Sequence, residues 1–289
     1  MRIGLLGTGP WAEIAHGPAL AAHPDVEFTG IWGRRPEAAA ALAATLGTRA
    51  YADVDDLIGD VDAVAIALPP DVQAPLAVRA AEAGRHLLLD KPVATTVTDA
   101  RLVADAAEAA GVASVVFFTL RFDATSSAWI DEQAARDGWF TARAQWLGSV
   151  FTSGDSPFAD SPWRREKGAL WDVGPHALSV LLPVLGDVTA LTAVQGPGDT
   201  VHLVLRHDGG ASSTAALSLT APPAAAGMTV ELRGTTGVAS LPERADGPVP
   251  AFGNAIDALL TAVGTGVPHP CDARFAARVT ELLASADPV

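Results

Sequence analysis

The stretch Leu87-Leu88-Leu89-Asp90-Lys91-Pro92 joins an apolar run directly to an acid, a base and a proline. The three leucines predict the end of a buried strand. In an open parallel sheet, ligands bind outside the carboxyl ends of the strands, so Lys91 is predicted to project into that crevice. Pro92 lacks an N–H and fixes its own φ, which ends the strand, and the Lys91–Pro92 bond is a candidate cis peptide. The alternative is a strand end with a surface lysine.

Apolar segments around this stretch alternate with alanine-rich helical segments as far as residue 120. Such alternation predicts an α/β fold with a doubly wound parallel sheet. Beyond residue 120 the pattern changes to short strands with polar turns, which predicts an α+β domain with an open, mainly antiparallel sheet. The strands predicted for the first part are Ile3–Leu6, Val26–Trp32, Val61–Leu68, His86–Leu89 and Ser114–Leu120.

The composition excludes several classes of protein. The 289-residue chain has a formal net charge of −14, which argues against a nucleic acid or an anionic membrane as partner. Its single cysteine, Cys271, permits neither an internal disulfide nor a cysteine metal cluster. Met1 to Gly7 read as a strand and a turn, with no room for a signal peptide, and no apolar run approaches transmembrane length. We therefore expect a cytoplasmic protein.

The first predicted strand leads into Gly7-Thr8-Gly9-Pro10-Trp11-Ala12, which has the pattern G-x-G-x-x-A. The first glycine permits a tight turn, the second lets the backbone approach a pyrophosphate, and Ala12 allows close packing of helix and strand. A helix near Trp11–Ala22 would direct its N-terminal amides at the phosphates. The motif lies after a strand and before a helix, as dinucleotide binding requires. A glycine turn without a ligand is the alternative.

The end of the second predicted strand suggests which dinucleotide is bound. NAD enzymes usually place an acid there to accept from the ribose 2′-hydroxyl, whereas this chain has Gly33-Arg34-Arg35. Two guanidinium groups suit a 2′-phosphate, so Arg34 and Arg35 favour NADP over NAD. The alternative is that both arginines are only solvated.

In the order of its motifs the chain resembles the Gfo/Idh/MocA family of glucose–fructose oxidoreductases and inositol dehydrogenases. The resemblance covers nearly the whole chain. It departs from the family pattern at Asp90, which replaces a Glu, at Gln73, where many members have a His, and at Lys167, which replaces a glycine, and the second domain is shorter than usual. The matching segments are Gly7-x-Gly9, Ala80 to His86, Asp90-Lys91-Pro92, Phe118 to Phe122, Trp163-Arg164 and Gly168 to His176.

The resemblance implies a two-domain organisation, with a dinucleotide-binding Rossmann domain over 1–120 and a substrate-binding and oligomerisation domain over 121–289. It also implies a homodimer or homotetramer formed through the C-terminal sheet. Asp208-Gly209-Gly210 predicts a hairpin in that sheet. The loop 153–162 is a candidate lid over the site. Two closing helices, 252–263 and 273–284, are expected to pack on the first domain.

Lys91, Asp172 and His176 match the family's catalytic residues position by position. A histidine titrates near neutral pH and can take or return the proton of a substrate hydroxyl. Asp172 would orient a hydroxyl or the imidazole, and Lys91 would polarise the reacting oxygen and bind the nicotinamide ribose. No metal is expected, because no ligand cluster surrounds His176. From the residues alone, His176 is equally a satisfied core histidine.

Further binding residues complete this prediction. The cofactor set is Gly7, Thr8, Gly9, Pro10, Trp11, Arg34, Arg35, Leu68, Pro69, Asp90 and Lys91. Alongside the catalytic residues, the substrate set includes Arg121, Trp163 and Arg164, although the arginines could instead stabilise the domain junction. Trp163 or Trp171 is predicted to stack on a sugar ring, while most other tryptophans fill the core.

These residues predict an NAD(P)-dependent oxidoreductase that moves hydride between nicotinamide and a hydroxyl or carbonyl carbon of a sugar, cyclitol or diol. A regulator or sensor that binds a dinucleotide and a ligand without turnover is one alternative. Reduction of an imine or enone double bond, which needs only a hydride and a proton donor, is another.

Overall fold

The computed structural model describes residues 1–244 and 247–287, and these form two compact units. The first unit holds residues 1–123 and 247–280, and the second holds 124–244 and 281–287. The second unit therefore differs from the predicted domain 121–289, because the segment 247–280 returns to the first unit. The cause is an apolar helix face in that segment, which packs on the sheet of the first unit.

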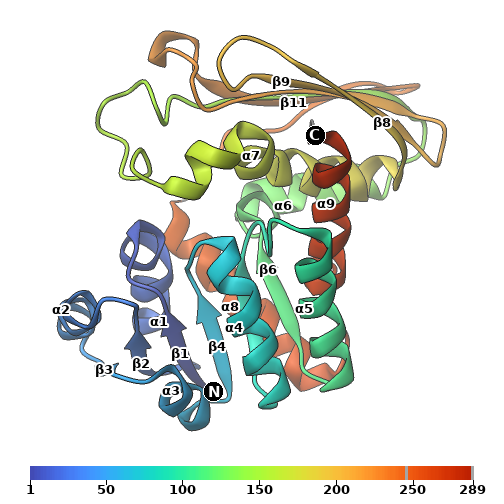
Figure 1. The fold of residues 1–289 in the computed structure, drawn as a ribbon. Helices are drawn as coiled ribbons and strands as arrows, with labels where there is room; N and C mark the ends of the chain where they lie inside the picture. Colours follow the sequence, from blue (N-terminus) through green and yellow to red (C-terminus); the bar gives the residue numbers. More distant parts are fainter. Residues whose placement is uncertain (245–246, 288–289) are drawn as a thin grey trace. The chain divides into compact units, whose positions relative to one another are not determined.

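Six parallel strands form the sheet of the first unit, in the order β3-β2-β1-β4-β5-β6 (Figure 1). The apolar residues of β1, β4, β5 and β6 are buried on both sides, as in a sheet covered by helices on both faces. The strands are β1 (Arg2–Leu6), β2 (Glu27–Trp32), β3 (Arg49–Tyr51), β4 (Ala63–Ile66), β5 (His86–Asp90) and β6 (Ser114–Phe117).

Helices cover both faces of this sheet. The helices α4 and α5 pack together on one face, while α1 and α8 pack together on the other (Figure 1). The helices of this unit are the π-helical turn η1 (Ala12–His16), α1 (Gly17–Ala22), α2 (Pro36–Leu46), α3 (Val54–Asp60), α4 (Pro70–Glu82), α5 (Val97–Ala109), the 3₁₀ turn η2 (Thr119–Arg121) and α8 (Pro248–Thr265). The helix α9 (Ala273–Ala286) begins in this unit, and its residues from Glu281 onward belong to the second.

The strand order reverses between β1 and β4. From β1 the chain runs outward through β2 and β3, then crosses to β4 on the other side of β1. Such a reversal opens a crevice at the carboxyl ends of the strands, where ligands of open α/β sheets bind. The segments that follow β1, β4 and β5 all start at this edge.

The second unit contains a mixed six-stranded sheet in the order β12-β11-β7-β10-β9-β8. Its strands are β7 (Trp139–Leu147), β8 (Val188–Gln195), β9 (Val201–His207), β10 (Ser212–Ser218), β11 (Gly227–Gly234) and β12 (Gly237–Ser240). The predicted hairpin at 208–210 is confirmed, since it joins the antiparallel strands β9 and β10. One neighbouring pair, β7 and β10, is parallel, because the chain between them passes through a helix and two further strands.

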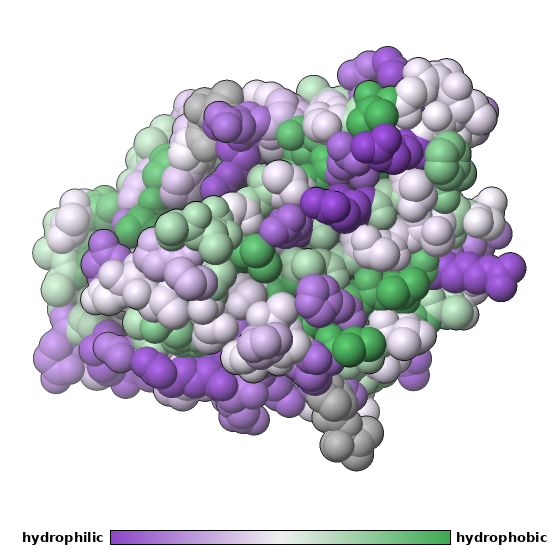
Figure 2. Space-filling model, turned by 90° about the horizontal axis from the view of Figure 1, so that it is seen from above, coloured by the Kyte–Doolittle hydropathy of each residue, from purple (hydrophilic) through white to green (hydrophobic). Residues whose placement is uncertain are grey.

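One face of this sheet is covered and the other is open. The helix α7 (Pro162–Leu185) packs on β7, β9 and β10, and α6 (Ala124–Ala134) packs on α7. The strand register places three more than half-exposed valines, Val194, Val204 and Val238, on the open face. Figure 2, which looks down on this face, shows hydrophobic residues interspersed with hydrophilic ones. A hollow of about 430 Å³ on the sheet is lined by Arg143, His202, Val204 and Thr214 among others.

By length and composition, α7 is apolar enough to cross a membrane, contrary to the expectation that no segment would be. However, 83% of its most apolar window is buried inside the protein. The helix is also interrupted at Gly168, where φ is 65° and ψ is −162°. Its hydropathy is explained by its place in the core of the second unit.

Candidate active site

The turn after β1 has the geometry that a dinucleotide phosphate needs. Gly7 has φ 136°, and a Cβ at this position would lie 2.3 Å from the carbonyl oxygen of Ala67, so only glycine fits. Its N–H donates to the carbonyl of Trp32 at 2.8 Å, which ties the turn to β2. At Gly9 an added Cβ would meet no protein atom within 4 Å. The backbone at Gly9 therefore borders open space, and Thr8, Pro10 and Trp11 lie beside it.

The helix that follows begins with a π-helical turn, in which the Gly17 N–H donates to the Ala12 carbonyl five residues earlier. Such turns are frequent at functional sites. The turn ends at His16, which is fully buried against Phe117 and Phe252. Because a carbonyl only accepts, the 3.1 Å contact to Trp11 O means that His16 Nδ1 carries the proton. Burial lowers the pKa of His16, although the charge of Asp90 opposes the shift.

Arg34 and Arg35 follow β2 directly, as predicted. Both side chains are exposed, and within residues 1–244 and 247–287 neither has a side-chain hydrogen bond or ion pair. Gly33 before them packs closely on Thr8, since a Cβ at Gly33 would lie 2.6 Å from Thr8 Cγ2. The two guanidinium groups are therefore available beside the glycine turn. Together, the turn and the arginines fit a dinucleotide.

Lys91 lies at the carboxyl end of β5 and is only 7% exposed. The Lys91–Pro92 peptide, a candidate cis bond from the sequence, is cis. The Asp90 carboxylate folds back and accepts the Lys91 N–H at 2.8 Å. Leu68 and Pro69 follow β4, the neighbouring strand, and Pro69 is the N-cap of α4. The predicted cofactor residues thus follow the strands β1, β2, β4 and β5 of one sheet.

Asp172 and His176 share one helical stretch of α7 in the second unit. The break in α7 lies at Gly168, before both residues, so the helix is continuous through Asp172 and His176 despite Gly174 and Pro175 between them. Gly174 packs closely on a neighbouring side chain, because a Cβ there would lie 2.8 Å from Leu283 Cδ2. The spacing of four residues therefore places Asp172 and His176 on one face of the helix.

Arg164 and Asp172 form a buried ion pair. The Arg164 Nε lies 3.1 Å from Asp172 Oδ2, and the two side chains are 11% and 9% exposed. The guanidinium also lies over the rings of Phe158 and Trp163, at 4.9 and 4.5 Å from their centroids. An ion pair that is largely removed from water holds both groups in fixed positions, because breaking it would leave an unpaired buried charge.

The imidazole of His176 stacks on Trp146, a contact that the sequence analysis missed. The ring centroids are 4.5 Å apart with 14° between the planes. Trp146 lies on β7, two residues after the buried Ala144 and therefore on the same, covered face as that residue. The period-two burial pattern of β7 was the available signal, but it shows only the face, not the partner.

Trp171 is wrong as a sugar-stacking residue. It is 1% exposed, and its indole N–H donates to Asp287 Oδ2 at 2.9 Å. Trp163 remains partly exposed and keeps this prediction open. Arg121 belongs to η2 in the first unit, so the predicted substrate residues are divided between the units, with Lys91 and Arg121 in the first and Trp163, Arg164, Asp172 and His176 in the second.

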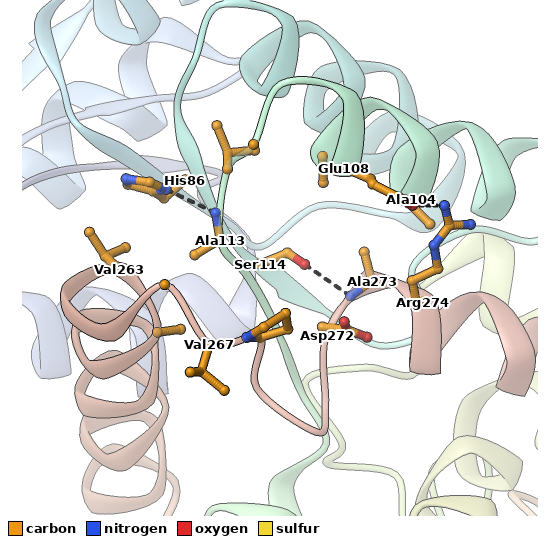
Figure 3. A pocket seen from close by; sticks show the side chains of 16 residues that line it. His86, Ala104, Glu108, Ala113, Ser114, Val263, Val267, Asp272, Ala273 and Arg274 are labelled. Atoms are coloured by element: carbon orange, nitrogen blue, oxygen red, sulfur yellow. Dashed lines mark hydrogen bonds and ion pairs between the residues drawn. The ribbon is translucent and has the colours of Figure 1, made fainter.

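Within the described residues, no group of three or more His, Cys, Asp or Glu side chains could hold a metal ion. A cavity of about 410 Å³ lies at the opposite edge of the first sheet, where His86 and Ser114 begin β5 and β6 (Figure 3). Its polar groups already bind one another. His86 accepts from Ala113 N, Ser114 accepts from Ala273 N, and Arg274 pairs with Glu108.

The sheet, the glycine turn and the crevice define the first unit as a dinucleotide-binding Rossmann domain. Comparison with known proteins then identifies the family. The model described as "Oxidoreductase family, NAD-binding Rossmann fold" matches residues 1–118, and that of the GFO/IDH/MocA C-terminal domain matches residues 146–240. The chain therefore belongs to the Gfo/Idh/MocA family.

Among curated relatives, a dTDP-3,4-didehydro-2,6-dideoxy-alpha-D-glucose 3-reductase of Streptomyces antibioticus is 32% identical over 67% of this chain and 60% of its own length. The levoglucosan dehydrogenase of Pseudarthrobacter phenanthrenivorans is 29% identical over 67% and 53%, respectively. The alignments thus span about three fifths or less of these relatives.

Among solved structures, GenD2 from gentamicin A biosynthesis in complex with NAD has a TM-score of 0.85 at 23% identity, covering 99% of this chain and 93% of its own. Levoglucosan dehydrogenase with NADH and levoglucosan has a TM-score of 0.84 at 21% identity, covering 99% and 96%. These likenesses confirm the predicted fold.

Proposed function

We propose that this protein is an NAD(P)-dependent oxidoreductase that transfers hydride between nicotinamide and a hydroxyl or carbonyl carbon of a sugar-, cyclitol- or diol-like small molecule. The observation that carries the proposal is the buried Lys91 at the carboxyl end of β5. It lies at the same edge of the sheet as the turn after β1, where only glycine fits at Gly7. The printed names of the relatives, a sugar 3-reductase and a levoglucosan dehydrogenase, support the substrate class.

The roles of the residues follow from their chemistry. The bound dinucleotide would supply or accept the hydride. His176 takes the proton of the substrate hydroxyl during oxidation and returns it during reduction. Asp172 is committed to Arg164, and this pair offers an acceptor and donors for further hydroxyl groups. The Lys91 ammonium stabilises negative charge that develops on the reacting oxygen.

For the cofactor, we propose a preference for NADP over NAD. Arg34 and Arg35 are exposed, unpaired among the described residues, and directly follow β2. Titration of tryptophan fluorescence with NADPH and NADH tests this. Tighter NADPH binding that weakens in Arg34→Ala is expected. Equal affinities that do not change in Arg34→Ala would contradict the preference.

Turnover tests the catalytic assignment. Lys91→Ala and His176→Ala should abolish turnover of a panel containing levoglucosan, myo-inositol and glucose, while dinucleotide affinity stays nearly intact. The chain has only two lysines, so Lys167→Ala is the matched control for the first variant. His202→Ala, at an exposed position of β9, is the control for the second. Wild-type turnover in either test variant would refute the assignment.

The same experiment separates the other two functions. A regulator or sensor would bind dinucleotide yet consume none with any substrate of the panel. A reductase of imines or enones would consume NADPH with those compounds and not with sugars or cyclitols. Consumption of NADPH with carbonyl, imine and enone panels in parallel therefore decides among the three.

We also infer a homodimer or homotetramer formed by the open face of the second sheet, and a cytoplasmic location without nucleic-acid or membrane partners. The three exposed valines on that face support self-association, and the net charge of −14 disfavours polyanionic partners. Light scattering should give a multimer that Val204→Arg dissociates. A monomeric wild type would overturn the oligomer.

A further inference from the structure

Gln73 is a fully buried polar residue of α4 that the proposed reaction does not use. Its side-chain amide makes several contacts with the backbone around Lys91. The Oε1 accepts the Asp90 N–H at 2.9 Å. The Nε2 donates to Asp90 O at 2.8 Å and lies 3.2 Å from Pro92 O and 3.3 Å from Val93 O. One side chain therefore hydrogen-bonds the main chain on both sides of Lys91.

These hydrogen bonds are needed because β4 ends before β5 does. On one side of β5, Asp90 still pairs with Phe117 of β6. On the other side the pairing between β4 and β5 stops at Ile66 and Leu89, since β4 ends and the chain turns into α4. The N–H and C=O of Asp90 would have no strand neighbour there. A buried backbone group without a partner is costly, so a substitute is required.

The Gln73 carboxamide is a close chemical substitute for a peptide group, with one carbonyl and one N–H₂. It bonds both the N–H and the C=O of Asp90, which a continued parallel strand would bond through two of its residues. The Asp90 carboxylate then accepts the next N–H, that of Lys91. The main chain is thereby held from Asp90 to Val93, and Lys91 lies inside the held segment.

We propose that Gln73 is a positioning residue that replaces the missing strand neighbour beyond β4 and fixes the backbone from which Lys91 reaches the substrate. The catalytic half of this proposal rests on the proposed function of Lys91, whereas the structural half does not. Gln73 itself touches only the main chain in the interactions described, so its effect on the reaction passes through Lys91.

Two nearly isosteric substitutions test the role. Gln73→Glu keeps an acceptor for the Asp90 N–H, but an ionised carboxylate would face three carbonyl oxygens. Only the protonated carboxyl can donate, so the introduced group should take up a proton on folding. Gln73→Met removes both functions and should be insensitive to pH. Asp71→Asn, at an exposed position of the same helix, is the matched control for a change of one charge.

The extent of lysine acylation by acetic anhydride, measured by mass spectrometry, reports how well the backbone keeps Lys91 buried. This measurement does not depend on turnover. Lys91 is buried and Lys167 is partly exposed, so Lys167 serves as the internal reference. Relative to wild type, the ratio of Lys91 to Lys167 labelling should rise several-fold in Gln73→Met at both pH 6 and pH 8. In Gln73→Glu it should rise at pH 8 and return toward wild type at pH 6. An unchanged ratio in both variants overturns the proposal.

Steady-state turnover measures the effect of the Gln73 substitutions on catalysis. In Gln73→Glu, kcat relative to wild type should be at least about tenfold lower at pH 8 than at pH 6, since one proton is involved. The dinucleotide Kd should stay near the wild-type value. A labelling change without any loss of kcat would overturn the positioning role. Full activity of Lys91→Ala would instead refute the proposed function, and the labelling result would still decide the structural half.

Discussion

In the glycine turn after β1, we expect one glycine to be needed for stability and the other for dinucleotide binding. Gly7 and Gly9 belong to the same motif, yet the structure assigns them different requirements. A Cβ at Gly7 would lie 2.3 Å from Ala67 O, at a φ of 136°. A Cβ at Gly9 would meet no protein atom within 4 Å. We therefore expect Gly7→Ala to destabilise the fold and Gly9→Ala to spare it.

The magnitudes follow from these contacts. For Gly7→Ala, backbone strain together with the steric overlap should cost about 2–6 kcal/mol of unfolding free energy. For Gly9→Ala, the unfolding free energy should change by less than about 1 kcal/mol. The methyl group would nevertheless occupy the space that a pyrophosphate needs. Loss of one charge-assisted hydrogen bond, about 1.5–3 kcal/mol, corresponds to a roughly 10- to 150-fold weaker dinucleotide Kd.

Urea unfolding and fluorescence titration with NADPH and NADH measure the two quantities on the same samples. The expected pattern is a folded Gly9→Ala protein with weak dinucleotide binding, and a Gly7→Ala protein with a lowered unfolding midpoint. Wild-type affinity in Gly9→Ala would refute the assignment of the turn to the phosphates. Wild-type stability in Gly7→Ala would refute the argument from close approach to Ala67.

Three further predictions concern stability. Burial lowers the pKa of His16, so the folded state binds fewer protons than the unfolded state and stability falls as the pH drops below about 6.5, by up to about 1.4 kcal/mol per pH unit. His16→Leu should lose less stability than wild type between pH 7 and pH 5 in urea titrations, and equal slopes would contradict this. The Asp199 carboxylate accepts from two backbone amides and two hydroxyls, so Asp199→Ala should cost about 3 kcal/mol in guanidinium unfolding, against under about 1 kcal/mol for the exposed Asp208→Ala. Similar losses in the two variants would refute a stabilising role of this half-buried hydrogen-bond network. Gly174→Ala should cost about 1–3 kcal/mol through contact with Leu283, and this cost should shrink when it is measured in a Leu283→Ala background; strict additivity would show that the two sites do not touch.

Much of the first sheet is predictable because its signals are local. The strands β1, β4, β5 and β6 are short apolar runs followed by a glycine, proline or charged residue, and burial on both faces makes these runs continuous. The strand β3 has no such run, because its residues are exposed or half-buried. The ends are less certain, as the predicted strand Val61–Leu68 is β4 (Ala63–Ile66) in the structure. The predicted helix near Trp11–Ala22 is present, but its π-helical turn depends on one backbone bond that no residue pattern encodes.

Non-local contacts account for what the sequence missed. The parallel pairing of β7 with β10 joins segments about 70 residues apart, and the return of α8 to the first sheet spans more than 100. The stacking of Trp146 on His176 and the contact of Trp171 with Asp287 are of the same kind. Periodicity shows which face of an element is buried, whereas only the fold shows which residue lies opposite.

The second unit also bears on which side chain moves the substrate proton. Asp172 and His176 occupy the same helix face, so position alone does not separate a carboxylate base from an imidazole base. Protonating Asp172 would cost its buried ion pair with Arg164, whose guanidinium is fixed over two aromatic rings. His176 is stacked on Trp146, a contact that orients its ring. The ion pair therefore favours His176 as the acid/base and Asp172 as a fixed negative charge. An Asp172→Asn variant should accordingly retain more turnover than His176→Ala, and the reverse order in steady-state assays would exchange the two roles.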